Sequence, residues 1–582
     1  MDSKHVTEST SGQEDIQKTW WKEAIIYQIY PRSFQDSDDD GIGDLNGITS
    51  RLDYIQSLGV DIIWLNPIFL SPNDDNGYDI SDYREIMREF GTMEDFDRLL
   101  KEIHKREMRL VLDLVVNHTS DEHPWFEEAR KSRHNPYYNY YHWWPAEKGE
   151  PPLRLSYFDE EGNAWTYNKP TDSYYLHYFS RKQPDLNWEN PEVRQEIFDM
   201  MRFWFDKGID GFRMDSISLI AKDPSFPLID SKKYPDIFSF YAKEPRLHLY
   251  LHEMNRQVLS KYDCMSVGEG SAVMVDDVAK FVDPAREELN MLYHFDAARI
   301  RNTTLPDNPE SGIDYSLIAL KKMFTEWDKA VDKGWPSIYL GNHDQPRMVS
   351  RFGSDKDEFR ALSAKMLITF LLTMRGTPYW FAGDEIGMRN IRFDRIEDYN
   401  DIDTINRYKK AKAEGKDPQA VLDEQKETGR DNARTPFQWD RSPEAGFTAG
   451  TPWLKVNPDY TWINVADEEK DPTSILNYFK KVVSFRKENP SLIYGSYHLL
   501  DAENPQSYTF LRKTGADTYL IMLNFSPKAA ISTPGIDMSN THVLLDNYGD
   551  RSHMAPQKDI TLRPFEAIVF QLNPSMNPSS IR

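Results

Sequence analysis

Apolar runs with strand character alternate with segments of helical pattern along the first part of the chain. Strand-like runs cover 24–30, 61–65 and 108–116, and helical patterns cover 47–58 and 92–107 between them. Strands separated by helices predict a parallel sheet joined by right-handed crossovers. Eight such units close into a (β/α)8 TIM barrel, whose active site lies at the carboxyl ends of its strands. We therefore expect an α/β fold built on this barrel.

Two segments interrupt the barrel pattern. Residues 119–184 are rich in Trp, Tyr, Pro and Gly and are too long for an ordinary loop. They predict an inserted small domain after the third strand. Residues 389–470 are irregular and charged, with a helical stretch at 408–426, and they predict a lid.

The pattern changes again near the C-terminus, where short alternating strands predict a separate antiparallel β-domain. Examples are the runs 507–511, 518–523 and 567–572. The expected division is 1–118 for the first part of the barrel with a short N-terminal tail, 119–184 for the insertion, 185–490 for the rest of the barrel with the lid, and 491–582 for the C-terminal domain.

Several strand-like runs end in polar or charged residues. Arg213 and Asp215 are two positions apart, and side chains at i and i+2 of a strand share one face. An arginine beside a carboxylate lowers its pKa and keeps it ionised, which suits a nucleophile. Glu269 ends another run without an adjacent cation in the sequence, so we expect its pKa to be raised. Other polar residues at such ends are Asp113, Asn117, His118, Asn342, His343 and Asp344.

In their order along the chain, these segments resemble the four signature regions of the α-amylase superfamily of glycoside hydrolases. The segments are DLVVNH (113–118), GFRMD (211–215), GE (268–269) and NHD (342–344). Two further segments, QPDLN (183–187) and GRDNARTP (429–436), resemble the oligo-1,6-glucosidase group within that superfamily. All of them occur in the family's order, which a single short motif could not establish. The resemblance runs from about Trp20 to the C-terminus.

The resemblance implies glycoside hydrolysis by paired carboxylates. It makes Asp215 the nucleophile, Glu269 the general acid/base and Asp344 a third carboxylate that holds sugar hydroxyls. Arg213 belongs to the same pocket, and Asp113 is interpreted as its structural support. Asn117 is expected to tie loops together.

The resemblance also implies residues that bind the sugar. Asp79 and Arg430 match a family pair that grips the non-reducing glucose. This grip closes the pocket and makes the enzyme exo-acting. Tyr78 is expected to stack on the sugar, and His118 and His343 to donate hydrogen bonds to its hydroxyls.

Three residues depart from the group's pattern. Ser216 follows the nucleophile, where a valine usually accompanies α-1,6 specificity, so we expect broad action on isomaltose, maltose or sucrose. Asp403 occupies the place of a glutamate that faces the +1 sugar in many relatives, and the shorter side chain leaves a gap or needs a bridging water. Gly270 follows Glu269 and leaves the +1 side more open.

Two alternative functions are considered. Sucrose isomerases and transglucosylases share nearly all these motifs, but sucrose isomerases carry a phenylalanine shortly after the catalytic glutamate and a stretch rich in Arg and Asp. Here Gly270 and Ser271 follow Glu269, and the stretch keeps Arg299 and Arg301 without the aspartates, so hydrolysis is favoured. A catalytically inactive binding subunit would be expected to lack the carboxylates that are present here.

An acidic loop near the N-terminus predicts a metal site. Aspartates at alternate positions with glycines for tight bends resemble the first part of an EF-hand loop. The family carries a similar loop that binds one structural divalent cation, calcium or alternatively magnesium. The expected ligands are the carboxylates of Asp36, Asp38, Asp40 and Asp44 and the carbonyl of Ile42. No organic cofactor is expected.

The composition of the chain excludes some classes of binding partner. The net charge of −24 disfavours nucleic acid and anionic membranes, so the expected partner is a small α-glucoside and the expected assembly a monomer or homodimer. Cys264 is the single cysteine, which rules out an intrachain disulfide. No apolar signal segment is visible at the N-terminus and no run approaches the ~18–20 residues of a membrane span, so we expect a cytoplasmic enzyme.

Overall fold

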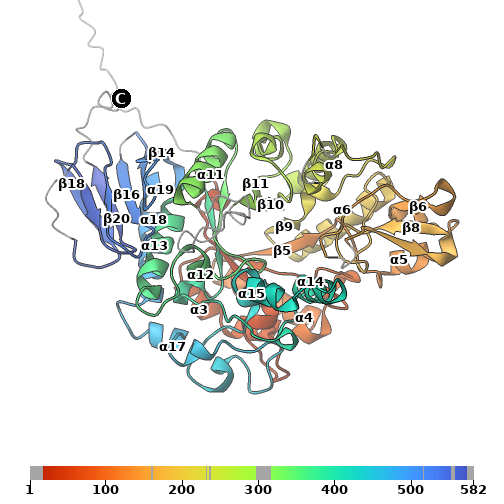
Figure 1. Cartoon of the computed structure of the whole chain (residues 1–582), viewed down its shortest axis with the longest axis horizontal. Helices are drawn as coiled ribbons and strands as arrows, with labels where there is room; N and C mark the ends of the chain where they lie inside the picture. Colours follow the sequence, from red (N-terminus) through yellow and green to blue (C-terminus); the bar gives the residue numbers. More distant parts are fainter. Residues whose placement is uncertain are drawn as a thin grey trace, which may run out of the picture.

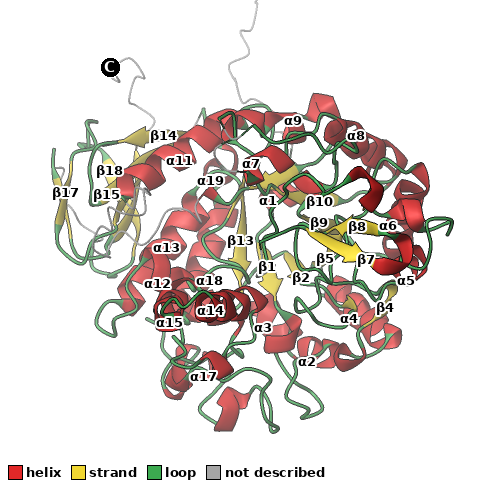
Figure 2. Cartoon of the chain, turned by 45° about the vertical axis from the view of Figure 1, so that its right-hand side comes forward, coloured by secondary structure: helices red, strands yellow, loops and turns green. Residues whose placement is uncertain are grey.

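Eight parallel strands form the centre of the molecule, as expected for the barrel (Figure 2). The strands at the two ends of the hydrogen-bonded order, β11 and β12, are joined where Ser337 Oγ donates to the carbonyl of Leu292 at 3.0 Å. The sheet is therefore close to a closed barrel. Its strands are β1 (Ile26–Ile29), β2 (Ile62–Leu65), β5 (Arg109–Val115), β9 (Gly211–Asp215), β10 (Met265–Glu269), β11 (Met291–Tyr293), β12 (Ser337–Ile338) and β13 (Thr377–Phe381).

The structure is a computed structural model that describes residues 18–158, 162–230, 232–234, 237–296, 316–515, 517–551 and 558–572. The N-terminal residues 1–17 and the two arginines of the isomerase comparison, Arg299 and Arg301, lie outside the described residues.

Alternate side chains of each barrel strand enter two different cores. Ile62 and Trp64 pack inside the barrel, whereas Ile63 and Leu65 pack outward against the helices. The strands are buried on both sides, which explains their continuous apolar sequences. A packed lumen of this kind is typical of a TIM barrel.

Helices surround the barrel, and their ends follow local sequence signals. Thr92 and Asp95 form a capping box at the start of α4, and Gly208 ends α6 with φ +110°, where a side chain would be strained. The described helices are α1 (Trp20–Glu23), α2 (Leu45–Ser50), α3 (Leu52–Ser57), α4 (Met93–Lys105), α5 (Pro124–Ala129), α6 (Pro191–Lys207), α7 (Phe238–Tyr241), α8 (Arg246–Gln257), α9 (Ala279–Val282), α11 (Leu317–Ala330), α12 (Met348–Phe352), α13 (Arg360–Thr373), α14 (Ile402–Ala413), α15 (Pro418–Thr428), α16 (Asp431–Arg434), α17 (Val465–Glu468), α18 (Ile475–Glu488) and α19 (Ser491–Tyr494).

The long segment after β5 carries its own small sheet. Its strands β6 (Trp143–Pro145), β7 (Trp165–Asn168) and β8 (Ser173–Leu176) pair in the order β6-β8-β7, and α5 precedes them. The sheet lies at one end of the long axis of the molecule and the C-terminal domain at the other (Figure 1). A short hairpin of β3 (Phe69–Leu70) and β4 (Asp82–Ile86) precedes α4.

The segment predicted to be one helix at 408–426 is instead two helices, α14 and α15. The chain reverses between them at Gly415, whose φ of +69° a continuous helix cannot contain. Asp417 then caps α15, with Pro418 at its first position.

The C-terminal domain is antiparallel, as expected. Its main sheet has the order β14-β15-β16-β20-β18, and β17 pairs with β19 beside it. The strands are β14 (Ser496–Leu500), β15 (Ser507–Lys513), β16 (Thr518–Asn524), β17 (Ala530–Ser532), β18 (Thr541–Asp546), β19 (Ile560–Leu562) and β20 (Ala567–Leu572). Within the described part of the chain, no helix has both the length and the apolar character needed to cross a bilayer.

Candidate active site

The three predicted catalytic carboxylates converge at the carboxyl ends of barrel strands. Asp215 is the last residue of β9 and Glu269 the last residue of β10, while Asp344 lies in the loop after β12. Asp215 and Glu269 are nearly fully buried, whereas the side chain of Asp344 is 25% exposed. The group thus lies at the barrel's carboxyl end, where TIM-barrel enzymes hold their active sites, and Asp344 is its most accessible member.

Arg213 binds carboxylates from three different places in the barrel. Its Nη1 donates to Asp113 Oδ1 at 2.7 Å and to Asp215 Oδ1 at 2.8 Å, and its Nη2 donates to Glu269 Oε2. The expectation that Asp113 supports Arg213 is confirmed. One buried guanidinium therefore holds the predicted nucleophile and the predicted acid/base close to each other.

The pKa values of the two carboxyls are both raised. Burial outweighs the Arg213 charge and raises the pKa of Asp215 to about 6. Burial together with the negative charges of Asp215 and Asp344 raises the pKa of Glu269 to about 8, against the opposing effect of Arg213. The prediction of a lowered Asp215 pKa is wrong, because the sequence did not show how deeply Asp215 is buried. Glu269 has no adjacent cation in the sequence, but the fold brings Arg213 to it, and its pKa is still raised, as predicted.

Asp344 lies beside two arginines and a histidine. Arg434 Nη2 donates to its Oδ1 at 2.9 Å, Arg430 Nη1 reaches the same oxygen at 3.3 Å, and His343 Nε2 lies 3.2 Å from its Oδ2. Burial favours the neutral acid, but the effect of these neighbours is larger and holds the pKa of Asp344 below its ordinary value. At ordinary pH Asp344 is therefore an anion, whereas Glu269, with its raised pKa, is a neutral acid.

Asp79, predicted to grip the glucose together with Arg430, does not contact Arg430. The two oxygens of Asp79 accept from Ser71 Oγ and from the backbone N–H groups of Asp74 and Asp75, so Asp79 organises its own loop. Arg430 instead contacts Asp75 Oδ1 at 3.3 Å. Asp75 was missed because it lies four positions before Asp79 in the same acidic segment, and one sequence does not distinguish them.

Arg430 has a second carboxylate partner that the sequence analysis also missed. Its Nε donates to Asp401 Oδ1 at 2.6 Å, and Asp401 caps α14 in the predicted lid. The guanidinium also lies over the ring of Phe158 from the inserted segment, 4.8 Å from its centroid. Asn406 Nδ2 of α14 donates to the Phe158 carbonyl at 2.7 Å. The predicted lid and the inserted segment therefore contact each other at Arg430.

Tyr78 and His343 form a stacked pair inside the site. Their ring centroids are 5.3 Å apart with an interplanar angle of 7°, and Tyr78 Oη lies 2.7 Å from His343 Nε2 and 3.0 Å from Asp113 Oδ2. The His118 ring lies next to Tyr78 with Nε2 3.0 Å from its carbonyl oxygen. Burial lowers the pKa of both histidines to about 3, so their rings are neutral at ordinary pH.

The two remaining predicted subsite residues flank this group. Ser216 directly follows Asp215, is buried and has φ +41°, a left-handed conformation. Asp403 lies in the first turn of α14, 4.0 Å from Arg407. Burial, reinforced by the Asp401 charge, raises the pKa of Asp403 to about 6. Asn117 bridges elements as expected, since its Oδ1 accepts from Lys222 and its Nδ2 donates to Asp185.

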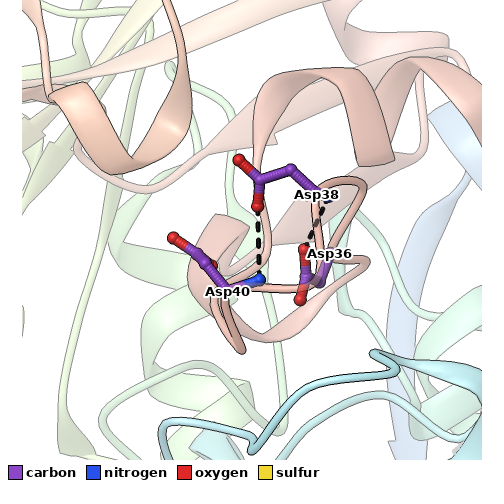
Figure 3. A group of neighbouring side chains, drawn as sticks. All are labelled: Asp36, Asp38 and Asp40. Atoms are coloured by element: carbon purple, nitrogen blue, oxygen red, sulfur yellow. Dashed lines mark hydrogen bonds between the residues drawn. The ribbon is translucent and has the colours of Figure 1, made fainter.

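The acidic loop brings three of its predicted ligands together (Figure 3). Candidate ligand oxygens of Asp36, Asp38 and Asp40 lie within 4.8 Å of one another. Ile42 N–H donates to Asp40 Oδ1. The oxygens of Asp44 accept hydrogen bonds from Ser37 and from the backbone N–H of Gly47 at the start of α2. Asp44 therefore acts as a helix cap in this structure.

Residues 28–495 match the catalytic domain of the alpha-amylase family. An oligo-1,6-glucosidase of Parageobacillus thermoglucosidasius is 51% identical, with 96% of this chain and all of that protein covered. A trehalose-6-phosphate hydrolase of Bacillus subtilis is 42% identical over 96% of this chain and 99% of its own length.

Solved structures agree with the sequence match. The isomaltulose synthase of Klebsiella sp. LX3 superposes with a TM-score of 0.91 at 42% identity, covering 95% of this chain and all of that one. A trehalulose synthase superposes with a TM-score of 0.90, also at 42% identity and with the same coverage.

Proposed function

The chain belongs to the alpha-amylase family and is a glycoside hydrolase, and from that premise we propose that it is a retaining, exo-acting α-glucosidase. The observation that carries the proposal is the shared binding of Asp215 and Glu269 by Arg213, with Asp344 beside them. Two carboxylates with different environments can divide the acid and nucleophile roles.

In the first step, Asp215 attacks the anomeric carbon while Glu269 gives its proton to the departing glycosidic oxygen. The bond from the anomeric carbon to that oxygen breaks, and a covalent glucosyl ester forms on Asp215. In the second step, the Glu269 carboxylate takes a proton from water, whose oxygen attacks the anomeric carbon and releases Asp215. Two inversions leave glucose with its original α configuration.

The exo action rests on Arg430 and its partners. Asp75, Asp344 and Asp401 hold the Arg430 guanidinium at the site, under Phe158 of the inserted segment. Contacts between the lid and the insertion would block a longer chain on that side of the sugar. One terminal glucose unit fits this arrangement better than the middle of a polymer.

We propose short α-glucosides as substrates, with activity on isomaltose and also on maltose or sucrose. The oligo-1,6-glucosidase relatives favour α-1,6 bonds, and the small Ser216 beside the nucleophile favours breadth, because spare room cannot strongly reject a substrate. Initial rates on isomaltose, maltose, sucrose and trehalose, side by side, test this. Turnover of isomaltose alone would contradict the proposed broad specificity. The absence of turnover on every α-glucoside would contradict the proposed function.

Sucrose isomerisation is the second candidate, because the isomaltulose and trehalulose synthases superpose closely on this chain. The two functions differ in what attacks the glucosyl ester, water or the released fructose. Product analysis on sucrose separates them. We expect glucose plus fructose, and a main product of isomaltulose or trehalulose would favour the isomerase.

We also propose one structural divalent cation in the acidic loop, calcium or alternatively magnesium. Asp36, Asp38 and Asp40 would hold it, with the Ile42 carbonyl, and within the described residues no lysine or arginine forms an ion pair with these aspartates. Burial and the neighbouring aspartates raise the pKa of Asp40, a like-charge cost that a cation would relieve. The oxygen-only donor set suits such a hard ion.

Elemental analysis and calorimetry test the cation. We expect one divalent ion per chain and a lower melting temperature after chelation, with an Asp38→Asn variant that responds less to the chelator. If no ion is found and chelator leaves the melting temperature unchanged, the loop is a solvated acidic turn.

We further propose that the enzyme works in the cytoplasm, as its single cysteine, Cys264, fits a reducing compartment. Activity found in the culture medium of intact source cells would contradict this.

A further inference from the structure

Two hydroxyl groups, in addition to Arg213, contact the carboxyl of Glu269. Ser271 Oγ donates to Glu269 Oε1 at 2.8 Å, and Tyr293 Oη donates to Glu269 Oε2 at 3.3 Å. Arg213 Nη2 donates to the same Oε2. Both oxygens of Glu269 are therefore engaged, and no family motif in the sequence pointed to either hydroxyl.

The strand register explains how Tyr293 reaches Glu269. Residues Glu269 and Tyr293 are paired across the parallel strands β10 and β11, and Gly270 N–H donates to the Tyr293 carbonyl at 2.8 Å. A Cβ on Gly270 would lie 2.9 Å from that carbonyl oxygen, so the close approach needs glycine. The Tyr293 ring is fixed edge-on against Tyr339, with centroids 5.5 Å apart.

The proton of Tyr293 has a defined direction. Arg213 Nε donates to Tyr293 Oη at 2.8 Å, and a guanidinium has donors only. Tyr293 must therefore receive from Arg213 and give its own proton to Glu269. Tyr293 is itself buried, and burial raises its pKa well above its ordinary value, so it remains a neutral donor.

We propose that Ser271 and Tyr293 are positioning residues that fix the carboxyl of Glu269 and stabilise its ionised form through their hydroxyl groups. The inference rests on the proposed function, in which Glu269 exchanges a proton with the glycosidic oxygen. A carboxyl that gives its proton to the glycosidic oxygen needs a fixed orientation as it becomes a carboxylate, and two donors on opposite oxygens supply it.

The charged and titratable groups that face Glu269 come from two strands and one loop. Arg213 and Asp215 belong to β9 and its end, Tyr293 to β11, and Tyr339 and Asp344 to the segment after β12. Asp215 and Asp344 oppose ionisation of Glu269, whereas Arg213 and the Ser271 hydroxyl favour it. Removing either hydroxyl should therefore raise the pKa of Glu269 further.

The first test needs no turnover. Glutamate labelled with ¹³C at the carboxyl carbon is followed by NMR against pH, and the signal of residue 269 is identified by its loss in Glu269→Gln. We expect Ser271→Ala and Tyr293→Phe each to raise the titration midpoint by on the order of half a unit to one unit. The matched control is Tyr379→Phe, which removes a buried lumen hydroxyl with no hydrogen-bond partner among the described residues. Its midpoint should equal that of the wild type.

The second test uses kinetics. Each variant should lose roughly five- to tenfold in kcat on maltose with little change in KM, and the alkaline limb of its pH profile should move upward. The loss should shrink on α-glucosyl fluoride, whose leaving group needs no proton in the first step. If the two hydroxyls had a purely structural role, kcat would fall equally on both substrates.

The two possible failures are separable. Midpoints in Ser271→Ala and Tyr293→Phe equal to the wild type would overturn the inference, whether or not the protein is active. A wild type that hydrolyses no α-glucoside would overturn the proposed function, and the titration would still decide whether the hydroxyls stabilise the Glu269 carboxylate. Ser271→Ala removes one partly exposed oxygen, so its fold is expected to survive if Tyr293→Phe does not fold.

Discussion

Two of the sites where arginine is fully buried differ in what surrounds the charge. In the barrel lumen, Arg213 meets three carboxylates. Where the C-terminal domain meets the barrel, Arg486 and Arg512 are equally buried but donate to backbone carbonyls, including those of Leu372, Thr373 and Leu492. Among the described residues, neither of them forms an ion pair with a carboxylate.

Arg213 holds carboxylates that take part in the reaction, whereas Arg486 and Arg512 hold the backbone of the interface together. Burial acts against the charge at both places, but Asp113, Tyr293 and Glu269 raise the pKa of Arg213 well above its ordinary value. At the interface, burial lowers the pKa of Arg486 to about 9, and no neighbouring carboxylate among the described residues opposes this shift. Carbonyl dipoles satisfy the hydrogen bonds of a guanidinium without adding charge that could react. We therefore expect mutations in the lumen to change activity and mutations at the interface to change stability.

The largest expected effect is the loss of a lumen carboxylate. Asp215→Ala removes the nucleophile, so kcat should fall by about 10⁴-fold or more. The cooperative melt and far-UV circular dichroism should remain, because Arg213 keeps Asp113 and Glu269 as partners and the Asp344 anion loses a repulsive neighbour. Near-normal turnover in this variant would remove Asp215 from the mechanism.

The next effect belongs to the interface. Arg486→Met leaves four buried carbonyls, at Leu372, Met374, Gly376 and Leu492, without this donor. The free energy of unfolding should fall by about 3 kcal/mol, seen as a lower melting temperature, while kcat per folded molecule is unchanged. The matched control is Arg441→Met, an exposed arginine paired with Asp467, which should change neither quantity. Equal losses in the two variants would contradict the comparison.

The pH dependence of activity should report the lumen charges. Asp215 must be ionised and Glu269 protonated for the first step, so kcat/KM should fall below about pH 6 and above about pH 8. The two groups interact, so these limits belong to the pair. A profile that stays flat up to pH 10 would show that Glu269 is not the acid.

The smallest expected effect lies at the edge of the lumen. Ser216→Val fills space beside the nucleophile and should shift the ratio of rates on isomaltose and maltose toward isomaltose by about tenfold. A β-branched residue is strained at the φ of +41° that Ser216 adopts, so the melting temperature should also fall. An unchanged ratio would show that Ser216 does not set specificity.

The barrel could be predicted from the alternation of strand and helix patterns, and the roles of the three carboxylates from the resemblance of their segments to the family's signature regions. Strand ends that carry Asp215 and Glu269 are visible as apolar runs that stop at a charge. The pKa of Asp215 could not be predicted, since it depends on burial by segments far away in the sequence. The partner of Arg430 was missed for a related reason, because only the three-dimensional path of the loop decides between Asp75 and Asp79. Ser271 and Tyr293 belong to no motif, and only the register of β10 and β11 reveals the contact of Tyr293 with Glu269.

The central claim is a covalent, retaining mechanism in which Asp215 and Glu269 divide the work. Proton NMR of the first sugar released from maltose or isomaltose tests it most directly, before mutarotation mixes the anomers. We predict that α-glucose appears first and β-glucose only later, at the rate of spontaneous mutarotation. β-Glucose as the first product would mean that water attacks the substrate directly, and would contradict the account.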